Sequence, residues 1–324
     1  MRSLWRDILA AVMMGMVVPG ILLNFAVLLL DRQSPVQSIQ ITVPAETQQA
    51  QSSIPVKIRQ QDGTVREWNM DTYLVGVVLA EMPASFETEA LKAQSVAART
   101  YARKAWETGG KHGDGSVCTD PGCCQSFIGT EDYLSRGGTA ESLEKVTNAV
   151  AETSGLCLKY GEELIEATYF SCSGGSTEDA AAVWGTEYPY LLSVDSPGEE
   201  NARWYTDTVI FLPEQFAAAL GAELTGNPDT WFGPVSYTEG GGVETMEIGD
   251  VIYTGTQLRS LLGLRSTAFT VAPSADRITI TTRGYGHRVG MSQYGAEAMA
   301  IQGSSFREIL AHYYPGTELV TITA

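Results

Sequence analysis

The sequence predicts an α+β protein: a single domain of mixed helices and antiparallel sheet, placed outside the cytoplasm behind one N-terminal transmembrane helix. Three observations support this. The chain has 324 residues with 44% hydrophobic content, enough for a sizeable core. A long uncharged apolar run lies near the N-terminus. Helix and strand patterns then follow one another without a repeat of about 20–50 residues.

The apolar run predicts a membrane anchor. Residues 8–30 contain no charged side chain, and a helix of that length, at about 1.5 Å per residue, spans roughly 34 Å, enough to cross a bilayer core. Arg2 and Arg6 precede it, which favours a cytoplasmic tail at residues 1–7 and an extracytoplasmic body at the cell membrane. A cleaved signal peptide is the alternative, although residues 28–32 offer no small-residue cleavage site.

Residues 31–54 are rich in Gln, Pro and Ser and show little apolar periodicity. This composition predicts a stalk that separates the membrane from a domain at residues 55–324. The net charge of −17 opposes a broad polyanion-binding surface, so we expect no nucleic-acid partner.

The domain begins with a predicted hairpin and two helices. Strands at residues 56–59 and 65–68 flank Asp62-Gly63, a tight-turn sequence. Asp71 is the expected N-cap of a helix that ends before Pro83. A second helix, starting near Ser85 or Thr88, carries closely spaced alanines that suit tight packing against the first.

Further helices and strands are expected along the rest of the domain. The predicted helices are residues 142–153, 213–220, 257–262, 292–302 and 305–313, and the predicted strands are residues 156–159, 164–170, 251–253, 269–271 and 278–282.

Glu81 is the first candidate for chemistry. It falls on the last turn of the first predicted helix, where the partial negative charge of the helix end disfavours an ionised carboxylate. That environment suits a general acid. A solvated surface glutamate is the alternative that position alone allows.

The segment RGYGHRVGMSQYGA, residues 283–296, is the second candidate. Gly284, Gly286 and Gly290 let the backbone approach a ligand, and nearby polar side chains offer donors for sugar hydroxyls or a carboxylate. An ordinary strand-to-helix turn explains the glycines equally well. The spacing is not that of a nucleotide-binding loop.

Two further clusters stand out. Residues 171–178, SCSGGSTE, lack the G-x-S-x-G pattern of a serine nucleophile and predict a substrate-contact or site-shaping loop. His112, Cys118, Cys123 and Cys124 lie in a polar loop, where they can form either a closed structural zinc site or a disulfide between Cys118 and Cys123.

Together, several blocks resemble the stage II sporulation protein D family. They are LAEMP at residues 79–83, EALKAQSVAARTY at 89–101, SGG at 173–175 with TE at 177–178, VWG at 183–185, and the glycine-rich segment. The resemblance covers about residues 55–324 in the same order, and the anchor matches too.

The resemblance implies a membrane-anchored lytic transglycosylase, a lyase acting on the bond between N-acetylmuramic acid and N-acetylglucosamine in peptidoglycan. Relatives cut peptide-stripped glycan strands while the forespore is engulfed during sporulation, together with stage II sporulation proteins P and M. No cofactor is implied for catalysis, and a structural zinc is implied for some relatives. Non-catalytic peptidoglycan-binding or amidase-enhancing relatives, and a hydrolase using Glu81 with Glu87 or Glu89, are the alternatives.

The resemblance implies roles for individual residues. Glu81 matches the family's essential acid, and His112, Cys118, Cys123 and Cys124 match the zinc-binding loop. Residues expected to line or support the glycan groove are Gln94, Arg99, Ser173, Thr177, Arg283, Tyr285, His287, Ser292, Gln293 and Tyr294. Two positions depart from the family pattern: Cys123 stands where a second histidine is expected, and Arg288 replaces a glycine.

Overall fold

The computed structural model describes residues 54–323. The predicted cytoplasmic tail, the predicted anchor at residues 8–30 and most of the predicted stalk lie outside this range. Within residues 54–323, no helix is both long and apolar enough to span a bilayer. Residues 50–324 form one compact unit, and its described part contains two hydrophobic cores.

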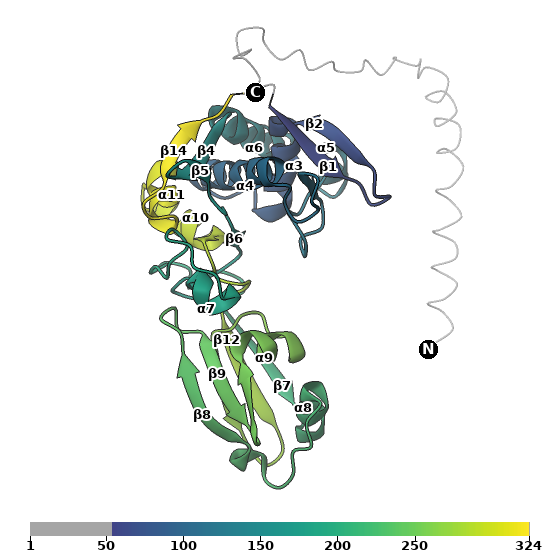
Figure 1. Ribbon diagram of the computed structural model, residues 1–324, viewed down its shortest axis with the longest axis vertical. Helices are drawn as coiled ribbons and strands as arrows, with labels where there is room; N and C mark the ends of the chain where they lie inside the picture. The colour runs from purple at the N-terminus through teal and green to yellow at the C-terminus, as the bar shows by residue number, and fades with distance from the viewer. Residues whose placement is uncertain (1–53, 324) are drawn as a thin grey trace, which may run out of the picture. The chain divides into compact units, whose positions relative to one another are not determined.

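Helix α4 (Thr88–Thr108) lies at the centre of the first core. It packs against α3 (Met70–Glu81), α6 (Ala140–Glu152), α10 (Gln293–Ile301) and α11 (Phe306–Tyr313) (Figure 1). The α4 alanines at positions 90, 93, 97 and 98 are fully buried. Small side chains let the helix axes approach closely, so the alanine spacing explains why one helix can contact four others.

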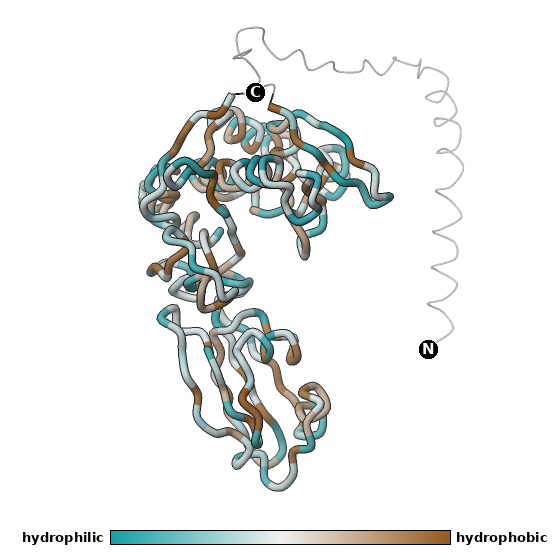
Figure 2. The backbone as a smooth tube through the Cα atoms, in the orientation of Figure 1, coloured by the Kyte–Doolittle hydropathy of each residue, from teal (hydrophilic) through white to brown (hydrophobic). Residues whose placement is uncertain are grey.

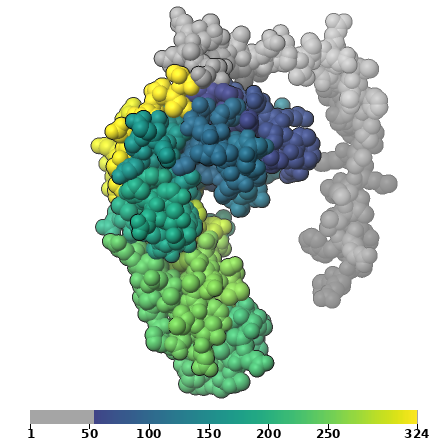
Figure 3. All heavy atoms as spheres, in the orientation of Figure 1, coloured from purple at the N-terminus to yellow at the C-terminus, as the bar shows by residue number. Residues whose placement is uncertain are grey.

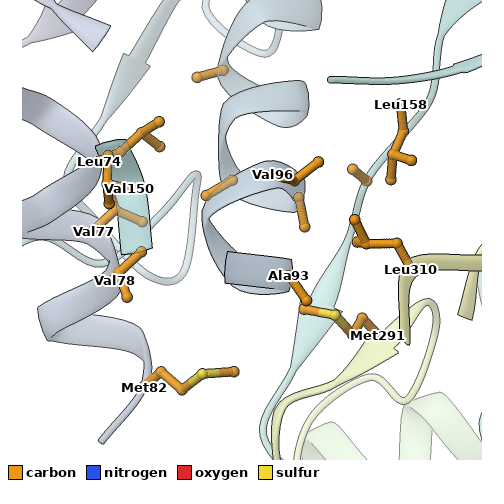
Figure 4. Packing of buried hydrophobic residues seen from close by; sticks show 14 of the residues in the cluster. Leu74, Val77, Val78, Met82, Ala93, Val96, Val150, Leu158, Met291 and Leu310 are labelled. Carbon is orange, nitrogen blue, oxygen red and sulfur yellow. The ribbon is translucent and has the colours of Figure 1, made fainter. Parts of the chain in front are cut away.

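The packing of this core is visible from close by (Figure 4). Leu74, Val77 and Val78 of α3 lie near Val150 of α6. On the other side of α4, Ala93 lies near Met291. Residues far apart in the sequence therefore share one core. This core fixes the C-terminal helices α10 and α11 against α4.

Small sheets border the first core. The first has the order β2-β1-β3, with β1 (Pro55–Arg59), β2 (Val65–Asn69) and β3 (Ser116–Cys118). Another has the order β14-β4-β5, with β14 (Glu318–Thr321), β4 (Leu156–Tyr160) and β5 (Glu163–Leu164). A short parallel pair joins β6 (Tyr169–Phe170) to β13 (Met291–Ser292).

The second core involves residues between 209 and 280. One sheet has the order β11-β12-β7, with β7 (Thr206–Phe211), β11 (Phe269–Pro273) and β12 (Ile278–Arg283), and the other has the order β10-β9-β8, with β8 (Phe232–Tyr237), β9 (Val243–Ile248) and β10 (Val251–Thr254). Helices α8 (Pro213–Leu220) and α9 (Gly255–Leu261) pack beside them. The strands of this core alternate between hydrophobic and hydrophilic residues (Figure 2), as expected for sheets with one buried face.

Three short helices complete the described elements: α5 (Thr130–Ser135), α7 (Ala180–Trp184) and the 3₁₀ helix η1 (Pro228–Thr230). The α+β prediction is confirmed, because helices and predominantly antiparallel sheets are both present. The predicted first hairpin is present, with β1 and β2 antiparallel.

Two local predictions were wrong. The N-cap of α3 is Asn69, whose side chain accepts a hydrogen bond from the Thr72 N–H. Asp71, the expected cap, lies inside the first turn and pairs with Arg99 instead. The expected strand over residues 164–170 is interrupted between β5 and β6. The two strands belong to different sheets, since β5 pairs with β4 and β6 pairs with β13.

Arg99 also differs from expectation. Its side chain is fully buried, pairs with Asp71 Oδ1 at 3.0 Å, and donates to the carbonyl oxygens of Val150 and Leu156. A side chain in this position cannot contact a glycan. It ties α4 to α3, to α6 and to β4.

We predict that Arg99→Leu lowers the free energy of unfolding by about 3–5 kcal/mol, because it leaves the Asp71 carboxylate without its cation. The matched control is Arg103→Leu on the same helix, whose partner Glu107 is exposed, and which should cost less than about 1 kcal/mol. Urea unfolding of both variants measures the difference. Equal, small losses would contradict a structural role for Arg99.

Candidate functional site

The described residues form a cleft of about 840 Å³. Its walls come from the end of α3, the loop at residues 111–126, the segment around β6, α7, α9 and the glycine-rich segment. In the space-filling view, atoms coloured blue, teal and green border a hollow in the surface (Figure 3). The residues that line the cleft include Glu81, Lys111, Cys123, Cys124, Ser126, Glu166, Tyr169, Trp184, Arg259, Tyr285, Gly286, His287 and Gln293.

Glu81 is the last residue of α3, and its carboxylate faces the cleft. The next residue, Met82, is already extended, as expected for a residue that precedes proline. Oε1 of Glu81 accepts a hydrogen bond from the Ser126 backbone N–H at 2.7 Å, and Oε2 lies 3.4 Å from Nε2 of Gln293. Two segments distant in sequence therefore hold one carboxylate at the cleft wall.

No basic side chain lies within 4 Å of the Glu81 carboxylate in the described part of the chain. The cleft has one other carboxylate, Glu166, among its described lining residues. Glu166 lies 3.2 Å from the ammonium of Lys104. Glu81 is thus the cleft carboxylate without a cation, which suits proton transfer to and from a ligand.

The four predicted metal ligands come together beside the cleft. Their ligand atoms lie within 4.8 Å of one another. The Nε2 atom of His112 is 3.6 Å from the sulfur of Cys124 and 3.8 Å from that of Cys123, and these two sulfurs are 3.8 Å apart. Zinc bonds of about 2.0–2.3 Å in a tetrahedron give ligand separations of about 3.3–3.8 Å, so this donor set fits zinc.

In the structure, Cys118, Cys123 and Cys124 are not joined in a disulfide. The loop that carries the ligands continues directly into Gln125 and Ser126. The same loop therefore carries both the four candidate metal ligands and the backbone donor to Glu81.

The glycines of residues 283–296 do something other than expected. A Cβ on Gly284 would lie 2.6 Å from the carbonyl oxygen of Ser173, and one on Gly290 would collide with the carbonyl oxygen of Thr168. Both glycines also have positive φ. Their bare backbone serves close packing against residues 168–174, and of the three only Gly286 lines the cleft.

Backbone hydrogen bonds join these two segments. Cys172 and Tyr285 exchange N–H to carbonyl bonds of 3.1 and 2.7 Å, and the Tyr294 N–H donates to the Ser171 carbonyl. The predicted site-shaping loop therefore supports the glycine-rich segment. Ser173 and Thr177, two of its predicted groove residues, are fully buried.

A buried glutamate fixes that loop. Glu199 accepts hydrogen bonds from the Ser173 N–H and hydroxyl at 2.7 and 2.8 Å and from the Cys172 thiol at 3.0 Å. The hydroxyl of Ser196 donates to the same carboxylate at 2.5 Å. Nothing in the sequence singled out Glu199, because its partners are distant donors that no local spacing predicts.

His287 presents its ring to the cleft between two aromatic side chains. Its centroid lies 5.6 Å from that of Phe170 and 5.4 Å from that of Trp184. The Val289 N–H donates to its Nδ1 atom at 3.1 Å. Burial, with the nearby positive charges of Arg259 and Lys111, lowers the pKa of His287 to about 4. The imidazole is therefore neutral near pH 7.

Arg288, which replaces a glycine of the family pattern, connects several segments of the structure. It is the one described non-glycine residue with positive φ, at 65°. Its buried guanidinium lies 2.8 Å from Oε1 of Glu178 and donates to the carbonyl oxygens of Ser173, Ser176 and Gly240. It joins the site-shaping loop to the turn between β8 and β9.

The remaining predicted groove residues divide into two groups. Tyr285 and Gln293 line the cleft with His287. The others lie outside its lining: Gln94 is fully buried, Ser292 is the N-cap of α10, Arg283 is exposed at the end of β12, and Tyr294 packs edge-on against Phe86. Glu87 and Glu89 of the alternative hydrolase also lie outside the cleft lining.

Several cleft residues had no sequence signal. Ser126 contributes only its backbone N–H, and Arg259 comes from the second core, in α9. Lys111 neighbours His112, one of the four predicted metal ligands, which is the one hint that the sequence contained.

We predict that stability falls as the pH drops from about 6.5 to about 4. In this window the unfolded chain binds a proton at His287 while the folded chain does not, so acid favours unfolding. His287→Gln should flatten the fall without changing stability above pH 7. Urea titrations from pH 7.5 to 4 test this, and an unchanged pH dependence in the variant would contradict a neutral, partly buried His287.

Comparison with known proteins identifies the family. A family model described as stage II sporulation protein matches residues 59–160. The stage II sporulation protein D of Bacillus amyloliquefaciens is 39% identical over 287 residues, covering 87% of this chain and 83% of that protein. The protein of the same name from Bacillus subtilis is 39% identical over 281 residues, covering 85% and 81%. An amidase enhancer of Bacillus subtilis is 30% identical over 306 residues, covering 76% of this chain and 40% of that protein.

The identity to the two sporulation proteins extends over most of each chain, and Glu81 and Ser126 fall within the matched region of the family model. The chain therefore belongs to the stage II sporulation protein D family.

Proposed function

We propose that this sporulation protein is a lytic transglycosylase that cuts peptide-stripped peptidoglycan strands during septal remodelling and forespore engulfment. One observation carries the proposal: Glu81 is a cleft carboxylate with hydrogen-bond donors but no cation, and among the described residues no second free carboxylate lines the cleft. A hydrolase ordinarily needs two carboxylates. A lytic transglycosylase needs one, because the substrate supplies its own nucleophile.

In this mechanism Glu81, in its acid form, gives its proton to the glycosidic oxygen as the bond from that oxygen to C1 of the muramyl sugar breaks. The carboxylate that remains accepts hydrogen bonds from Ser126 and Gln293. It then takes the proton of the C6 hydroxyl, whose oxygen bonds to C1. The products are a 1,6-anhydromuramyl end and a free 4-hydroxyl, and Glu81 is again protonated.

We also propose that His112, Cys118, Cys123 and Cys124 hold a structural zinc. Four protein ligands leave no open coordination position, so the metal would stabilise the loop and take no part in bond cleavage. The loop has little core of its own, and its order decides where the Ser126 N–H lies relative to Glu81. Metal binding would therefore act on catalysis through position.

The cellular setting is proposed from the sequence. Residues 8–30 would anchor the chain in the cell membrane as a single span, with the domain on the extracytoplasmic side. Stage II sporulation proteins P and M are the proposed partners. The similarity to an amidase enhancer keeps a non-catalytic peptidoglycan-binding role as the second candidate.

The main prediction concerns Glu81. Glu81→Gln should keep glycan binding and lose cleavage by about 10²-fold or more, because the amide can neither give nor take the proton. Mass spectrometry of products from peptide-stripped strands should show 1,6-anhydromuramyl ends with the wild type only.

Glu166→Gln is the matched variant, since it removes the other carboxylate of the cleft. It should still yield anhydro ends. Reducing ends that depend on Glu166 would indicate a hydrolase, and binding without any cleavage by the wild type would favour the amidase-enhancer role.

A second prediction concerns the metal. The purified protein should carry about one zinc per chain, and Cys124→Ser should lower both zinc content and cleavage because the Ser126 N–H loses its support. Thr119→Ala, in the same loop but outside the ligand set, is the control and should keep both. Elemental analysis with the cleavage assay measures this; full activity in a zinc-free Cys124→Ser protein would refute the positional role.

A further inference from the structure

The cleft contains two cations that no carboxylate neutralises. Lys111 and Arg259 both line it, in a chain whose net charge is −17. Within residues 54–323, neither side chain has a carboxylate oxygen within 4.0 Å. By contrast, Arg265 pairs with Asp207 at 2.7 Å although it lies only a short distance along the chain from Arg259. Unpaired cations amid excess acid indicate a site for an external anion.

Each cation is held by a backbone carbonyl that leaves further donors free. Nε of Arg259 donates to the Arg265 carbonyl at 3.2 Å, and the two terminal NH₂ groups have no hydrogen-bond acceptor among the described residues. The ammonium of Lys111 donates to the Cys123 carbonyl. The backbone contacts orient both side chains without neutralising them, as a preformed binding site requires.

The two cations converge on one region from different elements. Arg259 lies in the last turn of α9, and Lys111 lies in the loop that carries the metal ligands. Both are close enough to His287 for their charges to lower its pKa, and burial lowers the pKa of Arg259 itself. Because His287 is neutral, these two side chains supply the positive charge here. Trp184, whose ring is tilted against that of His287, forms an adjacent wall.

We propose that Lys111 and Arg259 form a subsite for the free lactyl carboxylate of a muramic acid residue. This inference rests on the proposed function. When a stem peptide is attached, the lactyl group is an uncharged amide; hydrolysis of that amide leaves a carboxylate on the sugar. The two cations gain charge-assisted hydrogen bonds from the carboxylate and remain uncompensated by the amide.

The subsite gives the cleft a means of distinguishing peptide-stripped glycan from intact peptidoglycan. Glu81 performs the same chemistry on either strand, so the discrimination resides in binding. The reaction that supplies this substrate is therefore hydrolysis of the lactyl amide. That hydrolysis creates the carboxylate that the subsite binds.

The test uses two muramyl-containing tetrasaccharides, one with free lactyl acids and one with lactyl methylamides. Isothermal titration with the full chain carrying Glu81→Gln avoids turnover. The acid form should bind roughly 10- to 100-fold more tightly, from charge-assisted bonds. Adding Arg259→Gln should reduce this preference about tenfold while leaving methylamide binding unchanged, and Arg259→Lys should keep part of it because the charge remains. Higher salt should weaken only the acid form.

Arg277→Gln is the control, because Arg277 is exposed on the turn between β11 and β12 and outside the cleft lining; it should keep the full preference. Equal binding of the two tetrasaccharides would overturn the subsite and leave the proposed function intact. A preference that survives in the double variant Lys111→Gln, Arg259→Gln would overturn the assignment to these residues. Failure of both sugars to bind would overturn the proposed function, and the subsite with it.

Discussion

The hydrogen bond from the Ser126 N–H to the Glu81 carboxylate is the contact on which the rest of the site depends. It fixes the end of α3 against the loop in which the four candidate ligand atoms lie within 4.8 Å of one another. Gln293, at the start of α10, holds the other carboxylate oxygen. The first core ties α3 and α10 to the same central helix, α4. Packing far from the cleft therefore keeps these three helices in fixed positions relative to one another.

The polar interior serves the same purpose. Arg99, Arg288 and Glu199 are buried, and each is surrounded by hydrogen-bond partners from distant segments. Such groups add little net stability compared with apolar residues of the same shape, but removing one partner is costly. They therefore specify one arrangement of the loops around the cleft. The glycines at 284 and 290 contribute by letting the two loop segments approach more closely than side chains would allow.

Local physical rules predicted much of this fold. Helical periodicity, Pro83 and Asp62-Gly63 located α3, α4 and the first hairpin, and ligand chemistry grouped His112 with the three loop cysteines. Tertiary pairings were not predictable in this way. Arg99 was expected to line or support the groove and no role was predicted for Arg288, because a sequence does not show that a carboxylate will meet either side chain in the interior. Spacing likewise could not show that the glycines face protein backbone, or that α9 of the second core contributes Arg259 to the cleft.

The proposed mechanism requires a single carboxylate to serve both proton transfers. A crystal structure of the Glu81→Gln protein with a muramyl-containing tetrasaccharide would show whether one does. We expect the glycosidic oxygen and the muramyl C6 hydroxyl both within about 3 Å of the residue 81 carboxamide, with no other carboxylate on the opposite face of the sugar. A glycan bound away from residue 81, or flanked by a second carboxylate with a water molecule at C1, would contradict it.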